Sequence, residues 1–367
     1  MRVLVIGAGL AGPCLAHALL RHGHDVQLLE RDAAVDARAQ GYRIHINADG
    51  DAALRRWLPP ADYELAHATS CLTTRGVAFA GPDLREFREI EIPPEAAGLT
   101  ADRLTLRRIM LRGLTGSVRF GAAFSRYELL EDATVRVHLA DGSTAEGDLL
   151  VATDGANSGV RRQLLPGFRV SVHGTRLIYG RTPLTAHVRA LTPEPALGGF
   201  LGVLGPDGRQ LALAAQRFRR SPAEFGLPQA QDYVMWSVAG AFGPELFDLG
   251  PADQLTLAAD GIADWHPSLS ALVRLGDLRY VVPATIQSSE RPGPWPPVPV
   301  TLVGDAAHPM PPAGISAGTA LHDAGLLAAH LVSGAPLPEA LRSYEREMLD
   351  HGFAAVAASG RSHPAQP

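Results

Sequence analysis

A carboxylate, a histidine and several prolines follow an apolar run near the end of the chain. In the segment TLVGDAAHPMPPAGISAGTALHDA, residues 301–324, Asp305 and His308 come directly after that run. An aspartate at the carboxyl end of a parallel strand lies where open α/β sheets bind ligands, and its oxygens can accept hydrogen bonds from a polyol. A helix is expected from about Ser316, and its N-terminal end would favour an anionic group. The segment therefore predicts a site for a hydroxylated ligand with anionic character.

A glycine-rich turn near the N-terminus predicts a dinucleotide site. Gly7, Gly9 and Gly12 follow the apolar run at 3–6 and open an expected helix. The first glycine permits a tight turn, the second lets a pyrophosphate approach the backbone, and the third lets the helix pack closely on the strand. The helix N-terminus offers N–H groups to the phosphates. Glu30, at the end of the next strand, is placed to accept ribose hydroxyls. By itself the turn does not distinguish FAD from NAD.

A third segment, GDLLVATDGANSGVRRQL, covers residues 147–164. It follows an expected hairpin and contains a buried strand that ends before Asp154, while Ser158 stands where the next helix would start. Asp154 and Ser158 could both be simple helix caps. A fourth segment, ADRLTLRRIMLRGL at residues 101–114, has the spacing of a helix.

These segments, in this order along the chain, resemble the FAD-dependent aromatic hydroxylases, which are single-component flavoprotein monooxygenases built like p-hydroxybenzoate hydroxylase. The resemblance implies FAD as cofactor, NADH or NADPH as co-substrate, and O2. One oxygen atom would be inserted into an electron-rich aromatic, polyketide-like or indole-like molecule through a flavin C4a-hydroperoxide. The chain ends at Pro367 soon after a helical segment, so it looks like the minimal, tetracycline-destructase-like form of the family.

The resemblance also implies which residues hold FAD. They are Gly7, Gly9, Leu10, Ala11, Gly12, Glu30, Arg31, Arg103, Asp154, Asp305, Pro312, Gly314, Ser316, Ala317 and Gly318. Arg103 would reach the ribityl–phosphate region; the alternative is a solvated helix face. The family often has Gly-x-Gly-Ala-Asn at the last turn, whereas this chain has Ser316 in place of the second glycine and Gly318 in place of the asparagine.

No catalytic side chain is firmly assigned by the sequence. Arg43 and His308 are candidates, with a surface position as the alternative for Arg43 and orientation of the proline-rich turn as the favoured alternative for His308. His266 is expected to cap or pack. The candidates for lining the substrate cavity are Tyr179, Arg181, Gln216 and Trp236.

The predicted fold class is α/β, with a Rossmann-type FAD-binding domain, an inserted β-sheet substrate domain and a C-terminal helix. The FAD-binding domain would be discontinuous and comprise residues 1–75, 100–170 and 280–367. The substrate-binding domain would comprise residues 76–99 and 171–279, where strand-like runs alternate with turns rich in proline and glycine.

Composition excludes several classes of function. The 367 residues carry a net charge of −5, which gives no electrostatic case for nucleic acid. All 33 basic residues are arginines, so chemistry that needs a lysine is excluded, including that of flavin-dependent halogenases. No Cys/His pattern predicts a metal site, and no apolar run reaches the roughly 18 residues of a membrane span. Cys14 and Cys71 allow one disulfide, but a reduced cytoplasmic protein is favoured. A monomer or weak dimer is expected.

Two other functions stay open from the sequence. The first is a flavin-dependent dehydrogenase or reductase on the same scaffold, without oxygen insertion. The second is a nucleotide-binding sensor or scaffold without enzymatic activity.

Overall fold

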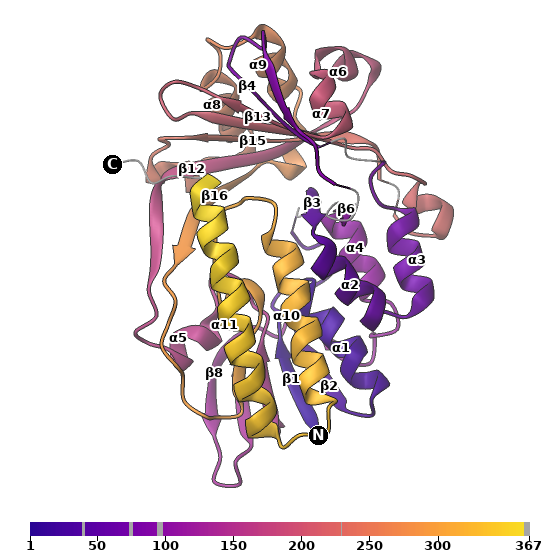
Figure 1. Cartoon of the computed structure of the whole chain (residues 1–367), viewed down its shortest axis with the longest axis vertical. Helices are drawn as coiled ribbons and strands as arrows, with labels where there is room; N and C mark the ends of the chain where they lie inside the picture. Colours follow the sequence, from indigo (N-terminus) through magenta and orange to yellow (C-terminus); the bar gives the residue numbers. More distant parts are fainter. Residues whose placement is uncertain (39–40, 73–75, 94–97, 229, 363–367) are drawn as a thin grey trace.

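The computed structural model describes residues 1–38, 41–72, 76–93, 98–228 and 230–362. Two large sheets lie toward opposite ends of its long axis (Figure 1). A five-stranded parallel sheet and its helices form the lower half in that view, and a seven-stranded sheet with its own helices forms the upper half.

The parallel sheet is assembled from strands that are far apart in the sequence. In spatial order it contains β17 (Val300–Leu302), β11 (Leu149–Ala152), β1 (Arg2–Ile6), β2 (Asp25–Leu29) and β7 (Val118–Arg119). Every pairing in it is parallel. Its central strands are apolar along their length because helices and other elements cover both faces, as is usual for parallel sheets. The strands expected before Gly7, Asp154 and Asp305 are confirmed, and their carboxyl ends meet at one edge.

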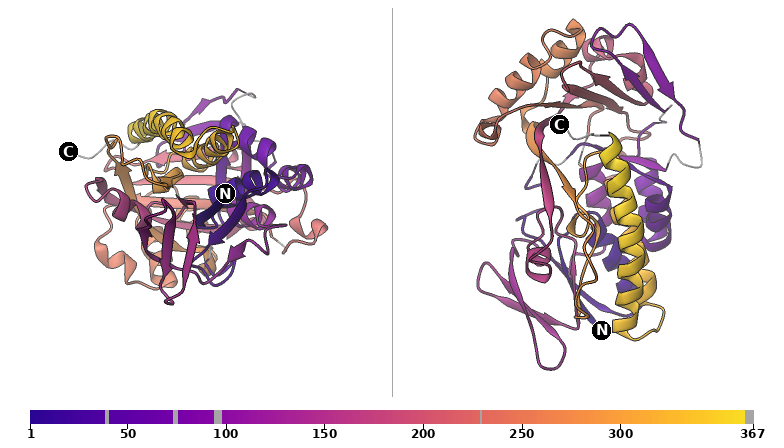
Figure 2. Two further views of the ribbon diagram at one scale, coloured as in Figure 1. Left: turned by 90° about the horizontal axis from the view of Figure 1, so that it is seen from below. Right: turned by 60° about the vertical axis from the view of Figure 1, so that its left-hand side comes forward.

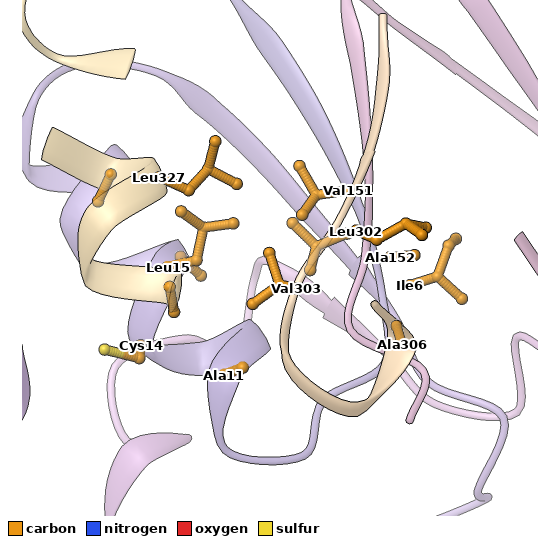
Figure 3. Close-up of a cluster of buried hydrophobic side chains, with 14 of the residues drawn as sticks. Ile6, Ala11, Cys14, Leu15, Val151, Ala152, Leu302, Val303, Ala306 and Leu327 are labelled. Carbon is orange, nitrogen blue, oxygen red and sulfur yellow. The ribbon is translucent and has the colours of Figure 1, made fainter. Parts of the chain in front are cut away.

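Helices surround this sheet. They are α1 (Ala11–Arg21), α2 (Ala48–Trp57), α3 (Pro60–Ala68), α4 (Arg103–Met110), α5 (Gly159–Leu164), α10 (Ser316–Leu331) and α11 (Leu337–Ser362). The close-up in Figure 3 shows Leu15 of α1 and Leu327 of α10 opposite Leu302 and Val303. The long helix α11 runs along the outside of this half toward the seven-stranded sheet, where it contacts β16 (Figures 1 and 2).

The seven-stranded sheet is mostly antiparallel. Its spatial order is β16 (Val282–Ser289), β12 (Val170–Pro183), β15 (Tyr233–Gly240), β14 (Gln210–Gln216), β13 (Phe200–Leu204), β4 (Val77–Ala80) and β5 (Phe87–Ile90). One face is covered by α6 (Ala186–Leu191), α7 (Glu194–Gly198), α8 (Pro251–Asp260) and α9 (Pro267–Arg274). The other face meets the half that contains the parallel sheet, where Tyr42 packs against Ala214, Tyr233 and Met235.

Two smaller sheets complete the fold. β3 (Arg43–Ile46) pairs with β6 (Leu99–Asp102), and this ribbon lies between α10 and the seven-stranded sheet. β8 (Phe124–Leu129), β9 (Val135–Leu139) and β10 (Thr144–Gly147) form an antiparallel sheet, in which β9 and β10 are the hairpin expected before residue 147.

The predicted α/β class with a Rossmann-type domain is confirmed. The domain limits stay a prediction, but β16 falls in the range 280–367 expected for the FAD-binding domain and pairs with β12 of the seven-stranded sheet. Cys14 and Cys71 are both free and buried. No helix in the described part of the chain combines the length and apolar character that crossing a membrane requires.

The helix-to-sheet contact of α1 generates a stability prediction. Leu15 is fully buried under the parallel sheet, so Leu15→Ala should leave a cavity and lower the free energy of unfolding by about 2–5 kcal/mol. Chemical denaturation measures this loss. Leu129→Ala, at a side chain that is 48% exposed, is the control and should cost far less. Equal losses for the two variants would contradict the packing described.

Candidate functional site

The glycine turn after β1 leaves no room for side chains at Gly7 and Gly12. Gly7 has a φ of 104°, in the left-handed region, and a Cβ there would lie 2.6 Å from the carbonyl oxygen of Thr153. A Cβ on Gly12 would overlap the carbonyl oxygen of Gly7. Helix α1 then begins at Ala11, and no side chain caps its N-terminal N–H groups. The turn is therefore packed against the end of β11 and presents bare backbone to a ligand.

Glu30 is tied to the glycine turn. It is 4% exposed, and its Oε2 accepts hydrogen bonds from the Ala8 N–H (2.9 Å) and from Nη2 of Arg107 (3.0 Å). Its Oε1 accepts the Asp32 N–H at 3.0 Å. A carboxylate offers about four acceptor positions, so three bonds leave one for a ribose hydroxyl. The expected ribose role of Glu30 stays a prediction, and the neighbouring Arg31 is exposed.

Arg107 is a structural residue of this site that the sequence analysis missed. Besides Glu30, its guanidinium donates to the carbonyl oxygens of Ala8 (2.6 Å) and Val35 (2.9 Å). It lies one helical turn after Arg103 on α4, and this spacing of four residues was the signal that both side chains share one face.

Arg103 lies beside the glycine turn. Its backbone N–H donates to the carbonyl oxygen of Tyr42 at 3.0 Å, and its guanidinium stands over the Tyr42 ring, 5.8 Å from the centroid. Its Nη2 would be 4.0 Å from a Cβ on Gly9. The expected reach of Arg103 to the ribityl–phosphate region of FAD stays a prediction.

Asp154 combines a capping role with an unused oxygen. Its Oδ2 accepts the Gly159 N–H at 2.9 Å, whereas its Oδ1 is buried without a partner in the described structure. Burial raises the pKa of this carboxyl group, although hydrogen bonds from Ser158 and Gly159 oppose the shift. Ser158 caps α5 by accepting the Arg161 N–H at 2.9 Å, which is the capping role that the sequence had left open for it. The unpaired Oδ1 is the acceptor that remains for a ligand.

Arg161 joins the ends of β11 and β17. Its Nη1 donates to the carbonyl oxygens of Asp305 (3.2 Å) and Ala306 (2.9 Å), and its Nη2 donates to that of Ala156 (2.6 Å). The side chain is buried, so these bonds fix the two turns relative to each other. The sequence analysis did not identify this role.

Asp305 is held by Ser316. The Ser316 hydroxyl donates to Oδ1 of Asp305 at 2.6 Å, while Oδ2 accepts no hydrogen bond from the described residues. Ser316, which departs from the family pattern, therefore orients the carboxylate. The first turn of α10 has no side-chain cap, Ala317 is half-buried, and Pro312 and Gly314 are exposed.

Gly318 is a contact between helices. A Cβ on Gly318 would overlap the side chain of Asn47, and a Cβ on Gly50 would lie 2.6 Å from the Gly318 Cα. The two glycines let α10 and α2 cross closely. Contact between Gly318 and a flavin ring stays a prediction, and a bulky substitution there would first displace α2.

His308 belongs to a buried polar cluster. It is 0% exposed, and its Nε2 lies 2.7 Å from Oδ2 of Asp323, which also accepts the Gly304 N–H at 2.8 Å. Nε2 of His351, on α11, lies 2.5 Å from the other Asp323 oxygen. These contacts support orientation of the turn by His308 rather than proton transfer to a substrate.

The four residues expected to line the substrate cavity lie on two different faces of the seven-stranded sheet. Trp236 was a wrong candidate because it is fully buried on the helix-covered face, where its Nε1 donates to Thr182. Tyr179, Arg181 and Gln216 lie on the other face of the sheet, toward the half that contains the parallel sheet. His266 caps α9, as expected.

The His308–Asp323 contact predicts a pH dependence of stability. Burial alone would lower the pKa of His308, but the Asp323 carboxylate raises it above the ordinary value. Burial alone would raise the pKa of Asp323, but His308 and His351 lower it to about 2. The stabilisation by protonated His308 is therefore complete below the ordinary pKa of histidine and is lost as the pH rises through the raised value.

We expect the stability difference between the wild type and His308→Gln to shrink as the pH rises from neutral into the alkaline range. Urea unfolding at a series of pH values measures it. The exposed His187 supplies the control, because His187→Gln should produce a small difference that does not vary with pH. A constant difference for His308→Gln would show that the pair does not carry charge.

Comparisons with known proteins also indicate a nucleotide-binding domain and a flavoprotein monooxygenase. A family model for NAD(P)-binding Rossmann-like domains matches residues 5–65. A dual O-methyltransferase/FAD-dependent monooxygenase of Phaeosphaeria nodorum is 32% identical over 89% of this chain and 39% of its own length. Another of Cercospora beticola is 31% identical over 94% of this chain and 44% of its own length. The chain thus spans about two fifths of these relatives. The 6-hydroxynicotinate 3-monooxygenase of Bordetella bronchiseptica is 27% identical over 89% and 81%.

Solved structures of other proteins match this fold over nearly the whole chain. A candidate FAD-containing monooxygenase from Photorhabdus luminescens has a TM-score of 0.87 and 30% identity, over 99% of this chain and 97% of that one. HpxO of Klebsiella pneumoniae, solved with FAD and uric acid, has a TM-score of 0.79 and 23% identity over 98% and 87%, which shows the fold alone. The glycine turn and the three strand ends agree with these similarities. The chain belongs to the FAD-dependent aromatic hydroxylase family of flavoprotein monooxygenases.

Proposed function

We propose that the chain is a monooxygenase that uses FAD, NADH or NADPH, and O2 to insert one oxygen atom into an electron-rich aromatic small molecule. The observation that carries this proposal is the convergence of three strand ends. The Gly7 turn, Asp154 and Asp305 follow β1, β11 and β17, and the N-terminal end of α10 opens at the same edge.

The residues at this edge fit FAD. The backbone around Gly9 is bare, and Arg103 stands beside it, which suits a pyrophosphate. Glu30 retains one acceptor position for a ribose, and Asp305 retains one oxygen for the ribityl hydroxyls. The buried, unpaired Oδ1 of Asp154 also calls for a donor from a ligand.

Bound FAD, once reduced by NADH or NADPH, supplies the electrons with which O2 is activated. The chain itself positions that cofactor. The uncapped first turn of α10 offers N–H groups and the positive end of the helix dipole to an anionic acceptor. Ser316 holds Asp305, and Arg161 holds the turn of Asp305 against that of Asp154.

An aromatic substrate is supported by the side chains between the two halves. Tyr42 and Tyr179 stack with their ring centroids 6.1 Å apart, and Phe200 packs on the same cluster as Tyr42. The relative from Bordetella bronchiseptica is named for a hydroxylated pyridine ring, and another from Pseudomonas aeruginosa is named as a 2-heptyl-3-hydroxy-4(1H)-quinolone synthase, which is 29% identical over 95% of this chain.

The direct test is isotope transfer. The purified protein is loaded with FAD and supplied with NADH or NADPH, isotopically labelled O2, and a panel of phenols, hydroxyquinolones, aromatic polyketides and indoles. Mass spectrometry should find one labelled oxygen atom in a product. Oxidation of NAD(P)H without label in any product would instead indicate a dehydrogenase or reductase. Protein that takes up no FAD would contradict both the monooxygenase and the dehydrogenase or reductase.

Asp305 provides a prediction about cofactor affinity. Asp305→Ala removes the acceptor for the ribityl hydroxyls, and each bond to a charged acceptor is worth about 1.5–3 kcal/mol. The dissociation constant for FAD should therefore rise about ten- to a hundredfold, as measured by titration of flavin fluorescence. Ser316→Ala, which keeps the carboxylate but loses its hydrogen bond, should have a smaller effect. An unchanged FAD affinity in Asp305→Ala would remove Asp305 from the site.

A further inference from the structure

Arg43 is a buried cation without an anionic partner among the residues that the structure describes. The described residues include three buried arginines, of which Arg107 pairs with Glu30 and Arg161 donates to three carbonyl oxygens. Arg43 is 8% exposed, forms no ion pair with any described carboxylate, and has a buried Nε without a hydrogen-bond partner. Burying an unpaired charge is costly, so such a residue calls for a ligand that supplies the missing partner.

The carboxylate across the β3–β6 ribbon from Arg43 already has other partners. Asp102 lies directly across from Arg43 in the β3–β6 ribbon, but its Oδ2 accepts the Tyr233 hydroxyl at 2.9 Å and lies 3.6 Å from Arg181. Its Oδ1 accepts both the N–H and the hydroxyl of Thr105 at 2.8 Å. Within the described structure, Arg43 instead interacts with the thiol of Cys71 and lies near Tyr233.

A second unpaired polar group lies in the same place. Gln216, the last residue of β14, is 0% exposed, and neither its Oε1 nor its Nε2 has a hydrogen-bond partner among the described residues. Tyr233 is its cross-strand partner, and the Cys71 thiol donates to the carbonyl oxygen of the preceding residue, Ala215. Arg43 and Gln216 are therefore both neighbours of Tyr233 and of the segment around Cys71.

Aromatic rings adjoin these two polar groups. Tyr42, directly before Arg43, stacks on Tyr179 of β12 with an angle of 21° between the ring planes. Both tyrosines are half-buried, and neither hydroxyl has a hydrogen-bond partner among the described residues. A guanidinium with an unpaired Nε, an unpaired amide and two phenol groups, beside aromatic rings, suit a flat molecule that carries oxygen substituents.

We propose that Arg43 is the residue that recognises the substrate, by binding an ionised phenol oxygen or similar anionic ring oxygen of a planar aromatic molecule. Gln216 pairs with a neighbouring ketone or hydroxyl group, and the ring lies beside Tyr42 and Tyr179. An ionised phenol is more electron-rich than its neutral form, which suits insertion of an electrophilic oxygen atom. This inference rests on the proposed monooxygenase function and adds the substrate class to it.

The test compares two probes on the protein loaded with FAD. Alizarin is a planar anthraquinone with two neighbouring hydroxyl groups and a ketone, whereas its dimethyl ether has the same rings and no group that ionises. Calorimetric titration should show that the wild type prefers alizarin. Arg43→Gln should reduce this preference about ten- to a hundredfold, the value of a charge-assisted hydrogen bond.

Two further variants separate recognition from structure. Arg43→Lys keeps a cation and should retain part of the preference, and Arg88→Gln, at an exposed arginine of β5, should leave it unchanged. Alizarin changes colour when it ionises, so its absorbance reports its charge. It should ionise at lower pH when bound to the wild type than in water, and this shift should vanish in Arg43→Gln.

The flavin absorbance of each variant distinguishes this inference from the proposed function. Protein that holds FAD but binds neither probe, or that shows the same preference and the same ionisation shift in Arg43→Gln as in the wild type, would overturn the role of Arg43 and leave the cofactor assignment intact. A wild type that holds no FAD would overturn the proposed function itself.

Discussion

The parallel alignment of β1, β11 and β17 is the constraint on which the site depends. These strands come from the start, middle and end of the chain, yet their carboxyl ends meet at one edge of the sheet. The glycine turn packs against the end of β11 so closely that neither Gly7 nor Gly12 can carry a side chain. Arg161 then fixes the turn after β17 to the turn after β11. A small shift between these strands would separate the groups that have to hold one cofactor.

Electrostatics distinguishes the supporting residues from the binding residues. Arg107, Arg161 and Asp323 are buried, and each meets partners supplied by the chain, so their charges are satisfied before any ligand arrives. Nε of Arg43, the Gln216 amide and Oδ1 of Asp154 are buried and have no hydrogen-bond partner among the described residues. Folded proteins rarely leave buried polar atoms unpaired, and these three groups lie where the proposed cofactor and substrate would bind, so we propose that a ligand supplies their partners.

The sequence was sufficient for the parts of the fold with local signals. Apolar runs of β-branched and aliphatic residues located β1, β11 and β17, and the spacing of glycines and polar residues placed Gly7, Asp154 and Asp305 at their ends. It could not reveal the partners of Arg107, Arg161 or Asp323, because these lie 77, 144 and 15 positions away and depend on how the strands and helices align. Trp236 was misplaced because strand alternation does not say which face of a sheet the helices cover.

A crystal structure of the protein with FAD tests the central claim most directly. The account predicts the pyrophosphate against the backbone at Gly9, a ribityl hydroxyl on Asp305, and one edge of the flavin ring at the N–H groups that begin α10 near Ser316 and Ala317. Arg43 should then remain without an anionic partner until a substrate is added. A flavin ring bound away from the start of α10, or a pyrophosphate that does not touch the glycine turn, would contradict the account.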